Sequence, residues 1–309
     1  MSPPVVTVII LNWCNEILTT NCVRSVLSSD YGALKVLLVD NGSPDNSFEQ
    51  LQASFPNIAF LQTGKNVGYT GGNNRGIEHA LKNGTDYILI LNNDTVLDRY
   101  TVSKLVDTAE MTSGKVGGVV PKILYYDDPN RIWYAGGEFS PLRGLGLHWR
   151  EGDLDQPNEA ASVQEITFMN GACCLIAAEA LRELNGFDEE FFAYVEDADL
   201  SLRMTSAGYQ IYYQPEARIL HHCGLPGTLP SPFQIRQRDR NRRRRGDVRD
   251  PWRRRALRSP APSGVRRSAR DRHTDCRGWL HGSRGRGRSH GFPSGGRDAV
   301  HGLHLTRIR

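Results

Sequence analysis

Residues 5–43 read VVTVIILNWCNEILTTNCVRSVLSSDYGALKVLLVDNGS, and this stretch decides the fold. It begins with a run of apolar and β-branched residues over positions 5–11, and a second run occupies positions 35–39. Such runs are typical of strands buried on both faces of a sheet. The segment between them, about residues 16–28, is predicted to be a helix. Strand, helix and strand in this order predict a βαβ unit with parallel strands.

The same alternation continues toward the C-terminus. Strands are predicted over residues 58–62 and 87–91, and helices over residues 48–55 and 73–83. The chain is therefore predicted to be an α/β protein with a mainly parallel central sheet flanked by helices. Ligands of such sheets bind at the carboxyl ends of the strands. After residue 120 the pattern loosens: residues 125–165 are predicted to be irregular or antiparallel, residues 166–177, 211–213 and 218–221 to be strands, and residues 178–184 and 197–207 to be helices.

Composition divides the chain near residue 224. Residues 225–309 hold 23 Arg and six Asp and neither Lys nor Glu, so their formal charge is +17, whereas residues 1–224 carry −13. The first part has the size and composition of an ordinary globular domain. The second part is rich in Arg, Gly, Ser and Pro, a composition that cannot bury a core. We therefore expect a folded domain over residues 1–224 and a disordered tail over residues 225–309.

The cysteines and the N-terminus indicate a cytoplasmic protein. The six cysteines show no C-x-x-C pair, which argues against structural zinc and is typical of a reducing compartment. Adjacent Cys173 and Cys174 lie in an apolar run and are predicted to be small buried residues. The apolar run over residues 5–11 is too short for a signal peptide or a membrane span.

A short polar turn, Asn92-Asn93-Asp94, ends the apolar strand predicted over residues 87–91. A divalent cation that binds a diphosphate needs few protein ligands, because Mg²⁺ keeps water and phosphate oxygens in its shell. Asn and Asp are also common in plain β-turns, so this segment alone leaves both interpretations open. His221 follows another predicted strand; it is either structural or completes a cation site with Asp94.

Two further polar loops follow predicted strands. Residues 40–43, DNGS, form either a plain turn, which the segment alone favours, or a nucleoside site, since Asp accepts hydrogen bonds from an imide N–H and from ribose hydroxyls. Residues 66–76, NVGYTGGNNRG, open a helix. They either present backbone N–H groups to a phosphate or form a flexible turn with an N-cap at Asn73.

Three carboxylates, those of Glu196, Asp197 and Asp199, crowd the start of a predicted helix within residues 191–203, FFAYVEDADLSLR. Like charges this close cost free energy unless a cation, a helix N-terminus or a substrate proton uses them. The spacing of Asp199 and Arg203 predicts an ion pair on one helix face, which leaves Asp197 near the positive helix end. Asp197 is therefore a candidate general base, and capping of the helix by its first acids is the alternative.

Taken together, these segments resemble the family 2 glycosyltransferases with the GT-A fold, in particular the rhamnosyltransferase-like branch. The resemblance runs from about residue 5 to residue 224. Each of its motifs is weak alone, and the four in register are specific. They are VDNGS (39–43), NVGYTGGNNRG (66–76), LNNDT (91–95) and GFDEEFFAYVEDADLSLR (186–203).

The resemblance implies roles for residues by their position in these motifs. Asp40 would contact the nucleobase, and Asp197 would be the catalytic base with Glu196 supporting it. The further residues implied around the nucleotide sugar are Asn41, Asn66, Gly68, Gly72, Asn73 and Asn93, and those implied on the acceptor side are Asn170, Gly171 and Asp199.

The resemblance also implies a metal cofactor, Mg²⁺ or Mn²⁺, bridging the diphosphate. Asp94 would bind it, and His221 matches a histidine that often helps to hold the metal or the diphosphate. The turn departs from a full D-x-D motif, because Asn92 stands where Asp is common. A single acid then remains, so the sequence indicates the fold more strongly than the metal site.

The activity implied is that of an inverting glycosyltransferase. It would move a sugar, L-rhamnose from dTDP-rhamnose as the first expectation, to a glycan or lipid-linked saccharide in cell-surface polysaccharide synthesis. Asp197 would take the acceptor proton, and residues 125–165 would cover the acceptor. The enzyme is expected in the cytoplasm, with peripheral contact at the inner face of the membrane.

The arginine-rich tail stands where family members continue with helices and loops that shape the acceptor site. It is interpreted as a nucleic-acid-binding arm, as a segment that binds anionic lipid headgroups, or as an out-of-frame translation. The abrupt onset after Gly224 and the absence of Lys favour the last, and nucleic acid is the less expected partner. Three rival functions follow: an inactive glycosyltransferase remnant, an RNA-binding protein acting through the tail, and a nucleotidyltransferase. The last would need a Gly-rich basic loop that residues 12–15 lack.

Overall fold

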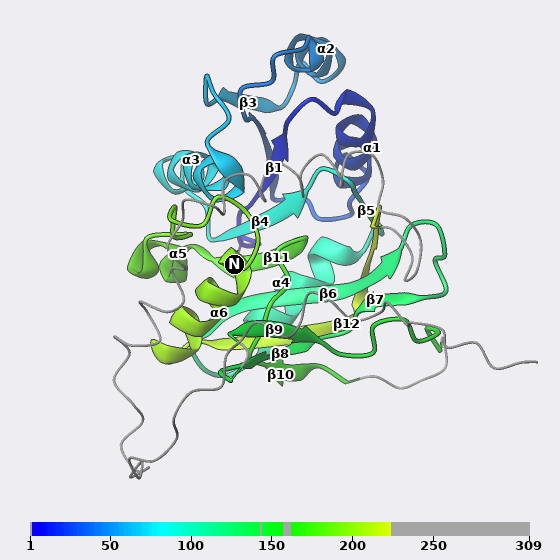
Figure 1. Cartoon of the computed structure of the whole chain (residues 1–309), viewed down its shortest axis with the longest axis vertical. Coiled ribbons are helices and arrows are strands. Elements are labelled where there is room, and N and C mark those ends of the chain that lie inside the picture. The colour runs from blue at the N-terminus through cyan, green and yellow to red at the C-terminus, as the bar shows by residue number, and fades with distance from the viewer. Residues whose placement is uncertain (1, 143, 157–161, 224–309) are drawn as a thin grey trace, which may run out of the picture. The chain divides into compact units, whose positions relative to one another are not determined.

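Helices and strands alternate through the first half of the chain, as predicted (Figure 1). The computed structural model describes residues 2–142, 144–156 and 162–223, and the tail predicted over residues 225–309 lies outside them. The helices are α1 (Glu16–Leu27), α2 (Ser47–Ser54), α3 (Gly68–Lys82), α4 (Thr101–Met111), α5 (Ala178–Leu184) and α6 (Glu196–Ser206). The strands are β1 (Val6–Asn12), β2 (Leu34–Asp40), β3 (Ala59–Gln62), β4 (Tyr87–Asn92), β5 (Thr95–Leu97), β6 (Val116–Tyr125), β7 (Ile132–Tyr134), β8 (Gly137–Ser140), β9 (Leu145–His148), β10 (Gln164–Ile166), β11 (Cys173–Ala177) and β12 (Gln210–His221).

One large sheet forms the centre, and its strand order is β10-β12-β6-β11-β4-β1-β2-β3. β1 lies parallel to both β2 and β4, which places Asn12 beside Asp40 and Leu11 beside Asn92. β11 runs antiparallel between β4 and β6, and β6 lies parallel to β12. The predicted α/β class is therefore confirmed, with parallel central strands and a mixed sheet beyond β4.

Helices cover β1 on both of its faces, with α1 and α3 on opposite sides of it in Figure 1. On one face α3 lies very close, because a Cβ added at Gly76 would stand 2.7 Å from Ile9 Cγ2. On the other face, Thr19 of α1 reaches Asn12, with 2.9 Å between Thr19 Oγ1 and Asn12 Oδ1. Val6, Val8, Ile9 and Ile10 of β1 are fully buried, and each such side chain stabilises the fold by roughly 1.5–3 kcal/mol.

The helix predicted over residues 73–83 begins earlier than expected. α3 starts at Gly68, which rules out the alternative of a flexible turn with an N-cap at Asn73. The first turn forms because a backbone carbonyl from a distant segment accepts a hydrogen bond at its start, from Tyr69 N to Phe192 O at 2.7 Å. Sequence periodicity carries no information about a partner that is more than a hundred residues away.

The second half of the chain also differs in detail from the prediction. The strand expected over residues 166–177 is two strands, β10 and β11, separated by a turn through Asn170 and Gly171. The two short strands expected over residues 211–213 and 218–221 are one strand, β12, with a register shift between Gln214 and Arg218. The region 125–165 is antiparallel where it pairs, as expected, in the β6–β7 and β8–β9 pairs.

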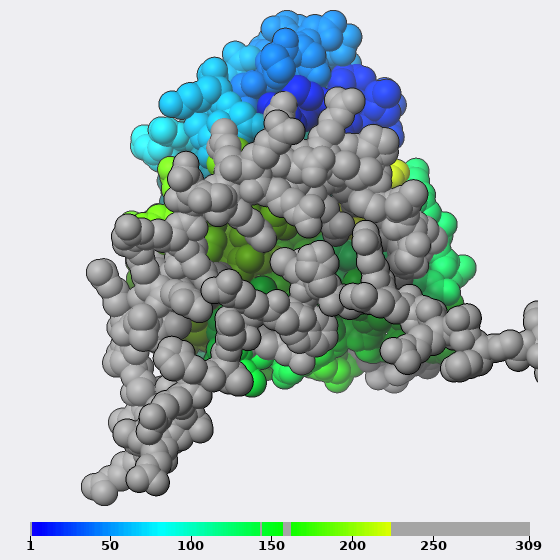
Figure 2. All heavy atoms as spheres, viewed as in Figure 1, coloured from blue at the N-terminus to red at the C-terminus, as the bar shows by residue number. Residues whose placement is uncertain are grey.

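Cys173 and Cys174 are buried in β11, as predicted. Within the described residues, none of the helices combines the length and the apolar character needed to traverse a bilayer. Figure 2 shows the first βα repeats, in blue and cyan, grouped at one end of the face seen in Figure 1. The residues predicted to carry function lie where these repeats meet the later strands.

Candidate active site

The ends of four central strands meet at one edge of the sheet. β1, β2 and β4 are parallel neighbours, so Asn12, Asp40 and Asn92 end at the same edge. β11 runs the other way, which brings the turn that precedes it to this edge as well, with a hydrogen bond of 2.9 Å from Asn92 N to Ala172 O. Four segments from separate parts of the sequence therefore converge here.

Asp94 and His221 form a buried pair at this edge. Asp94 lies in the turn between β4 and β5, and β5 pairs with the end of β12 so that Thr95 faces His221. His221 Nε2 lies 3.2 Å from Asp94 Oδ1, and their side chains are 8% and 22% exposed. Burial alone would lower the pKa of His221, but the Asp94 carboxylate outweighs it and raises the pKa to about 10. His221 is thus held in its charged form beside Asp94.

Several buried polar atoms in this part of the site have no hydrogen-bond partner. They are Asp94 Oδ1, His221 Nδ1 and His222 Nε2, so the 3.2 Å approach of Asp94 to His221 is an ion pair without hydrogen-bond alignment. Buried polar atoms normally have partners, and those left without one often point to an ion or ligand. Among the described residues, no cluster of three or more His, Cys, Asp or Glu side chains could hold a metal. Any cation here would take two protein ligands and complete its shell with water or phosphate oxygens, as Mg²⁺ commonly does.

The acid segment presents Asp197 to the same edge. Asp197 Oδ2 accepts a hydrogen bond from Gly171 N at 3.0 Å, and its Oδ1 accepts one from Ala198 N at 2.8 Å. Burial raises the pKa of Asp197, while these two amides act to lower it. The side chain remains half-buried, and it lies at the N-terminus of α6, where the helix dipole favours an ionised carboxylate.

The backbone just before α6 is strained. Tyr194 and Val195 have φ angles of 70° and 75°, in the left-handed region that β-branched residues rarely adopt. Such conformations cost roughly 1–3 kcal/mol each and cluster at functional sites. Glu196 follows directly, is only 7% exposed, and has an Oε2 atom without a hydrogen-bond partner. Burial and the neighbouring Asp197 carboxylate raise the pKa of Glu196 to about 8.

Tyr69 connects the two acidic parts of the site. Burial raises the pKa of its hydroxyl well above the usual value, and the neighbouring groups that add to the shift include Glu196, Asp197 and Asp94. Hydrogen bonds agree with this: Asn92 N, two residues before Asp94, donates to Ala172 O, and the adjacent Gly171 N donates to Asp197 Oδ2. The structure brings Asp94 and Asp197 together on the same side of the sheet.

Asp40 lies at this edge but is fully buried. Its Oδ1 accepts hydrogen bonds from Asn12 Nδ2 at 3.0 Å and Ser43 Oγ at 2.6 Å, and its Oδ2 accepts one from Ser43 N at 3.1 Å. Thr19 Oγ1, beside Asn12, accepts a hydrogen bond from Asn93 Nδ2 at 2.8 Å. Asp40 and Asn93 thus hold the ends of β2, β1 and β4 together, and their contact with the nucleotide stays a prediction.

The other residues predicted around the nucleotide sugar also have structural partners. Asn41 Oδ1 accepts a hydrogen bond from Val67 N at 3.1 Å, and Asn66 Oδ1 accepts one from Gly68 N at 3.0 Å. Gly72 packs so tightly that a Cβ there would stand 2.5 Å from Leu11 Cδ1. Asn73 Nδ2 donates to Tyr69 O at 3.0 Å, and its Oδ1 has no partner. The binding of nucleotide by these residues stays a prediction.

Asp199 was predicted on the acceptor side, and its contact with an acceptor stays a prediction. Asp199 is 1% exposed, and Arg203 Nε lies 2.7 Å from its Oδ2, as the i, i+4 spacing predicted. Arg203 also donates to the carbonyls of Leu184 and Gly186, each at 2.9 Å. Through Arg203, this ion pair ties α6 to the end of α5.

A model of the family described as "Glycosyltransferase like family 2" matches residues 3–246 of the chain. The chain belongs to this family. The match extends past residue 224, where the resemblance seen in the sequence ended. The protein is therefore an enzyme, and its fold is the GT-A fold of these glycosyltransferases.

Curated relatives of this glycosyltransferase act in sugar transfer. The chain is 31% identical over 208 residues to an N-acetylglucosaminyl-diphospho-decaprenol L-rhamnosyltransferase of Mycobacterium tuberculosis, with 61% of this chain and 66% of the relative covered. It is 29% identical over 203 residues to Galactofuranosyltransferase GlfT1 of the same organism, with 63% and 62% covered. The matches span somewhat less than two thirds of each relative's length.

A solved structure confirms the fold of this glycosyltransferase. The mannosyltransferase PcManGT from Pyrobaculum calidifontis, in complex with GDP-Man and Mn²⁺, aligns with a TM-score of 0.52 and 17% identity. The alignment covers 73% of this chain and 59% of the mannosyltransferase. At this identity the likeness shows the fold alone.

The sequence did not single out three aromatic residues of the glycosyltransferase site. His148 Nε2 lies 3.1 Å from Asn170 Nδ2, and His148 Nδ1 lies 3.3 Å from Trp133 O. Burial lowers the pKa of His148, so it is neutral, with its proton placed on Nδ1 by these two partners. The Trp133 ring lies 4.5 Å from that of His221, and Tyr126 stacks on His222 at 3.5 Å. These residues fall within or beside 125–165, and only the density of aromatic residues there could have pointed to them.

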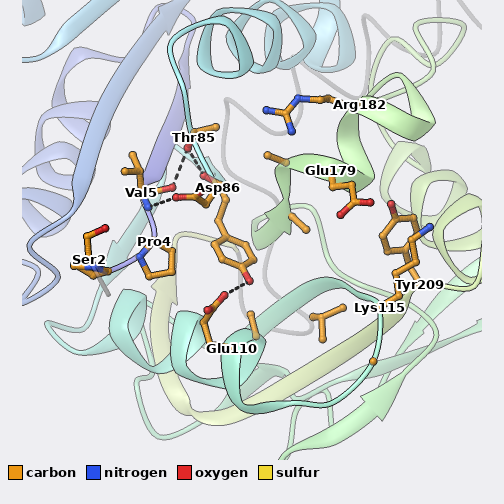
Figure 3. A pocket seen from close by; sticks show the side chains of 17 residues that line it. Ser2, Pro4, Val5, Thr85, Asp86, Glu110, Lys115, Glu179, Arg182 and Tyr209 are labelled. Carbon is orange, nitrogen blue, oxygen red and sulfur yellow. Dashed lines mark hydrogen bonds between the residues drawn. The ribbon is translucent and has the colours of Figure 1, made fainter.

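The opposite edge of the sheet carries a hollow of about 1090 Å³ (Figure 3). Residues just before β1, β4 and β6 line it, namely Val5, Asp86 and Lys115, together with Tyr209. The described residues around this hollow include no predicted site residue. Because ligands of parallel sheets bind at the carboxyl ends of strands, we assign the chemistry to the other edge.

Proposed function

We propose that this glycosyltransferase moves a sugar from a nucleoside diphosphate to a saccharide acceptor, with inversion at the anomeric carbon. The observation that carries the proposal is the convergence of Asp94 and Asp197 at the carboxyl edge of the sheet, where the turn before β11 contacts both the end of β4 and Asp197. One acid is then available to the diphosphate and the other to the acceptor. The rhamnosyltransferase name of the first relative supports L-rhamnose, donated by dTDP-rhamnose, as the sugar to test first.

Asp197 suits the part of general base in this proposal. Its two amide hydrogen bonds favour the ionised form, and its side chain is open enough to meet an acceptor hydroxyl. The carboxylate takes the hydroxyl proton as the acceptor oxygen forms its bond to the anomeric carbon. The bond from that carbon to the diphosphate breaks on the opposite side, so no covalent enzyme intermediate is required.

Asp94 and His221 are the residues that would hold Mg²⁺ or Mn²⁺. Asp94 Oδ1 and His221 Nδ1 have no hydrogen-bond partner, which fits a cation that keeps water and phosphate oxygens in its shell. To bind a metal through Nδ1, the charged His221 would lose its Nδ1 proton and keep the Nε2 proton that faces Asp94, so binding would release a proton. When bound, the cation offsets the negative charge that develops on the leaving diphosphate.

The acceptor, the place of action and the domain boundary belong to the same proposal. A lipid-linked saccharide is the acceptor that the name of the first relative suggests, and such an acceptor would place the enzyme at the cytoplasmic face of a membrane. Asn170 and Gly171 lie beside Asp197, on the side where the acceptor would bind. We take the catalytic domain to end near residue 224.

Thermal unfolding with a panel of nucleotide sugars tests the donor site. With Mn²⁺ present, we expect dTDP-rhamnose at about 100 times its Kd to raise the Tm of the protein by roughly 5 °C or more. UDP-galactose and GDP-mannose serve as comparison donors. Asp94→Ala should abolish the metal-dependent part of the shift, because it removes the single acid of the turn. If no nucleotide sugar raises the Tm of either protein, the donor site is assigned wrongly.

A transfer assay tests the base separately. Asp197→Asn should lower kcat by roughly 10²–10⁴-fold, the usual contribution of a general base. The same variant should keep the nucleotide-dependent rise in Tm, since Asp197 is assigned to the acceptor. An Asp197→Asn protein with normal kcat would rule out the proposed mechanism.

A further inference from the structure

The geometry points to Tyr69 as a positioning residue that holds the Asp197 carboxylate in place through Gly171. This inference rests on the proposed role of Asp197 as the base. It gives the glycine-rich segment over residues 66–76 a task that differs from the phosphate binding considered for it from the sequence. That task is to hold the acid segment, residues 186–203, against the first turns of α3.

Tyr69 makes three separate contacts with the polypeptide around Asp197. Its backbone N donates to Phe192 O at 2.7 Å, and its ring meets the Phe187 ring edge-on at 6.0 Å. Its hydroxyl donates to Gly171 O at 2.8 Å. One residue of α3 therefore holds both the segment that leads into α6 and the turn that precedes β11.

Gly171 passes this restraint to Asp197. The same residue that accepts from the Tyr69 hydroxyl donates its own N–H to Asp197 Oδ2 at 3.0 Å. A Cβ added at Gly171 would stand 3.5 Å from both the Tyr69 hydroxyl oxygen and Asp197 Oδ2, so Gly171 lies directly between them. Without the Tyr69 hydroxyl, the turn that carries this amide loses one of the bonds that fix it.

Neighbouring residues of α3 strengthen the attachment. Thr70 Oγ1 donates to Phe191 O. Asn74 forms a reciprocal pair with the backbone of Phe187, with Nδ2 to O and N to Oδ1 each at 2.9 Å. Gly68 is required where the chains cross, because its φ is +87° and a Cβ there would stand 2.5 Å from Phe192 O. The Tyr69 amide at the N-terminus of α3 is thus used by the protein itself, which argues against a phosphate at this position.

The Gly171 amide also affects the ionisation of Asp197. The titratable groups near Asp197 are Glu196 on α6, His148 on β9, Tyr69 on α3, Cys174 on β11 and Tyr134 on β7. Against the burial that raises the pKa of Asp197, the Gly171 N–H acts to lower it. A looser Gly171 turn should therefore raise the pKa of the base.

Tyr69→Phe tests the inference, because it removes the hydroxyl and keeps the ring. We expect kcat to fall about 10-fold or more, since small misplacements of a catalytic group are costly, while the donor KM stays within about twofold. The acid limb of the kcat–pH profile should move to higher pH. Thr70→Val, which removes the bond to Phe191 O, should lower kcat in the same way and provides a second variant.

Tyr31→Phe is the matched control. The Tyr31 hydroxyl also donates to a distant backbone carbonyl, Pro4 O, at 2.6 Å, but this bond lies at the opposite edge of the sheet. It should lower Tm by an amount similar to Tyr69→Phe and leave kcat and the pH profile unchanged. If Tyr69→Phe behaves as Tyr31→Phe does while Asp197→Asn is inactive, the inference is wrong and the proposed base stands. If Asp197→Asn is active, the proposed function fails as well.

Discussion

Glu196 is a carboxyl group that folding places in an unfavourable environment. Its pKa of about 8 in the folded protein lies above the usual value of 4.5, because it is buried beside Asp197. Between pH 4.5 and 8 the unfolded chain gives up a proton that the folded chain keeps. The free energy of unfolding therefore falls as the pH rises through this range.

Glu196→Gln should remove most of this pH dependence. The variant should gain stability relative to the natural protein as the pH rises from 5 to 8, by about 1 kcal/mol or more at the upper end. Urea denaturation of both proteins at pH 5, 6.5 and 8 measures the difference. Parallel stability curves would show that Glu196 ionises as freely in the folded protein as in the unfolded chain.

Individual site residues could be predicted from the sequence only where their position in the chain decides their place. Asp94 follows the end of a strand, and Asp197 lies in the first turn of a helix. The topology alone carries both residues to one edge of the sheet. The orientations of Asp40 and Asp199 depend on partners, Asn12 and Arg203, that turn the carboxylates inward. His148 reaches the site through a β-hairpin, and no local pattern of the sequence specifies where that hairpin packs.

At the scale of elements, the contact of α3 with β1 depends on glycine. A Cβ at Gly76 would stand 2.7 Å from Ile9 Cγ2 and 3.1 Å from Val39 Cγ2, and both side chains belong to fully buried strand residues that cannot move aside easily. The sequence placed Gly76 in the predicted helix over residues 73–83 but gave no reason for a glycine there, since glycine normally weakens a helix. The helix tolerates Gly76 because this residue allows it to lie close to the sheet.

Gly76→Ala should therefore destabilise the protein, although alanine favours helices. We expect a loss of about 1 kcal/mol, since overpacking of roughly 1–3 kcal/mol outweighs the gain in helix propensity of about 1 kcal/mol. Gly32→Ala is the control, because a Cβ there meets nothing within 4 Å. Thermal unfolding of both variants decides the matter. A higher Tm for Gly76→Ala than for the natural protein would contradict the close packing described here.

At the scale of the whole described fold, the two edges of the sheet have different tasks. The edge at the carboxyl ends of the parallel strands holds the carboxylates assigned to catalysis. The edge at their amino ends holds the hollow with its polar rim. At that rim the Tyr87 hydroxyl donates to Glu110 Oε1 at 2.6 Å (Figure 3). The parallel core that separates the edges was predictable from the apolar runs, whereas the pairing of β12 with β10 and β5 was not, because these partners are far apart in the sequence.

Glu110→Gln checks this division of tasks. It should leave kcat and both KM values within about twofold, and it should lower stability by no more than about 1 kcal/mol, because the bond it weakens is exposed. Steady-state kinetics beside a melting curve give both quantities. A loss of transfer activity comparable to that of Asp197→Asn would show that the chemistry has been assigned to the wrong edge of the sheet.

The docking of residues 186–192 on the first turns of α3 has a consequence for recombining this enzyme with its relatives. The two segments are far apart in the chain, yet they fit closely. Gly68 leaves room for Phe192, and Gly186 leaves room for Asn74, which bonds to the backbone of Phe187. A chimera that takes only the acid segment from a relative would lack the matching residues of α3 that bind this segment. Exchange of segments to change donor or acceptor preference should therefore succeed only when the acid segment and the start of α3 come from the same relative.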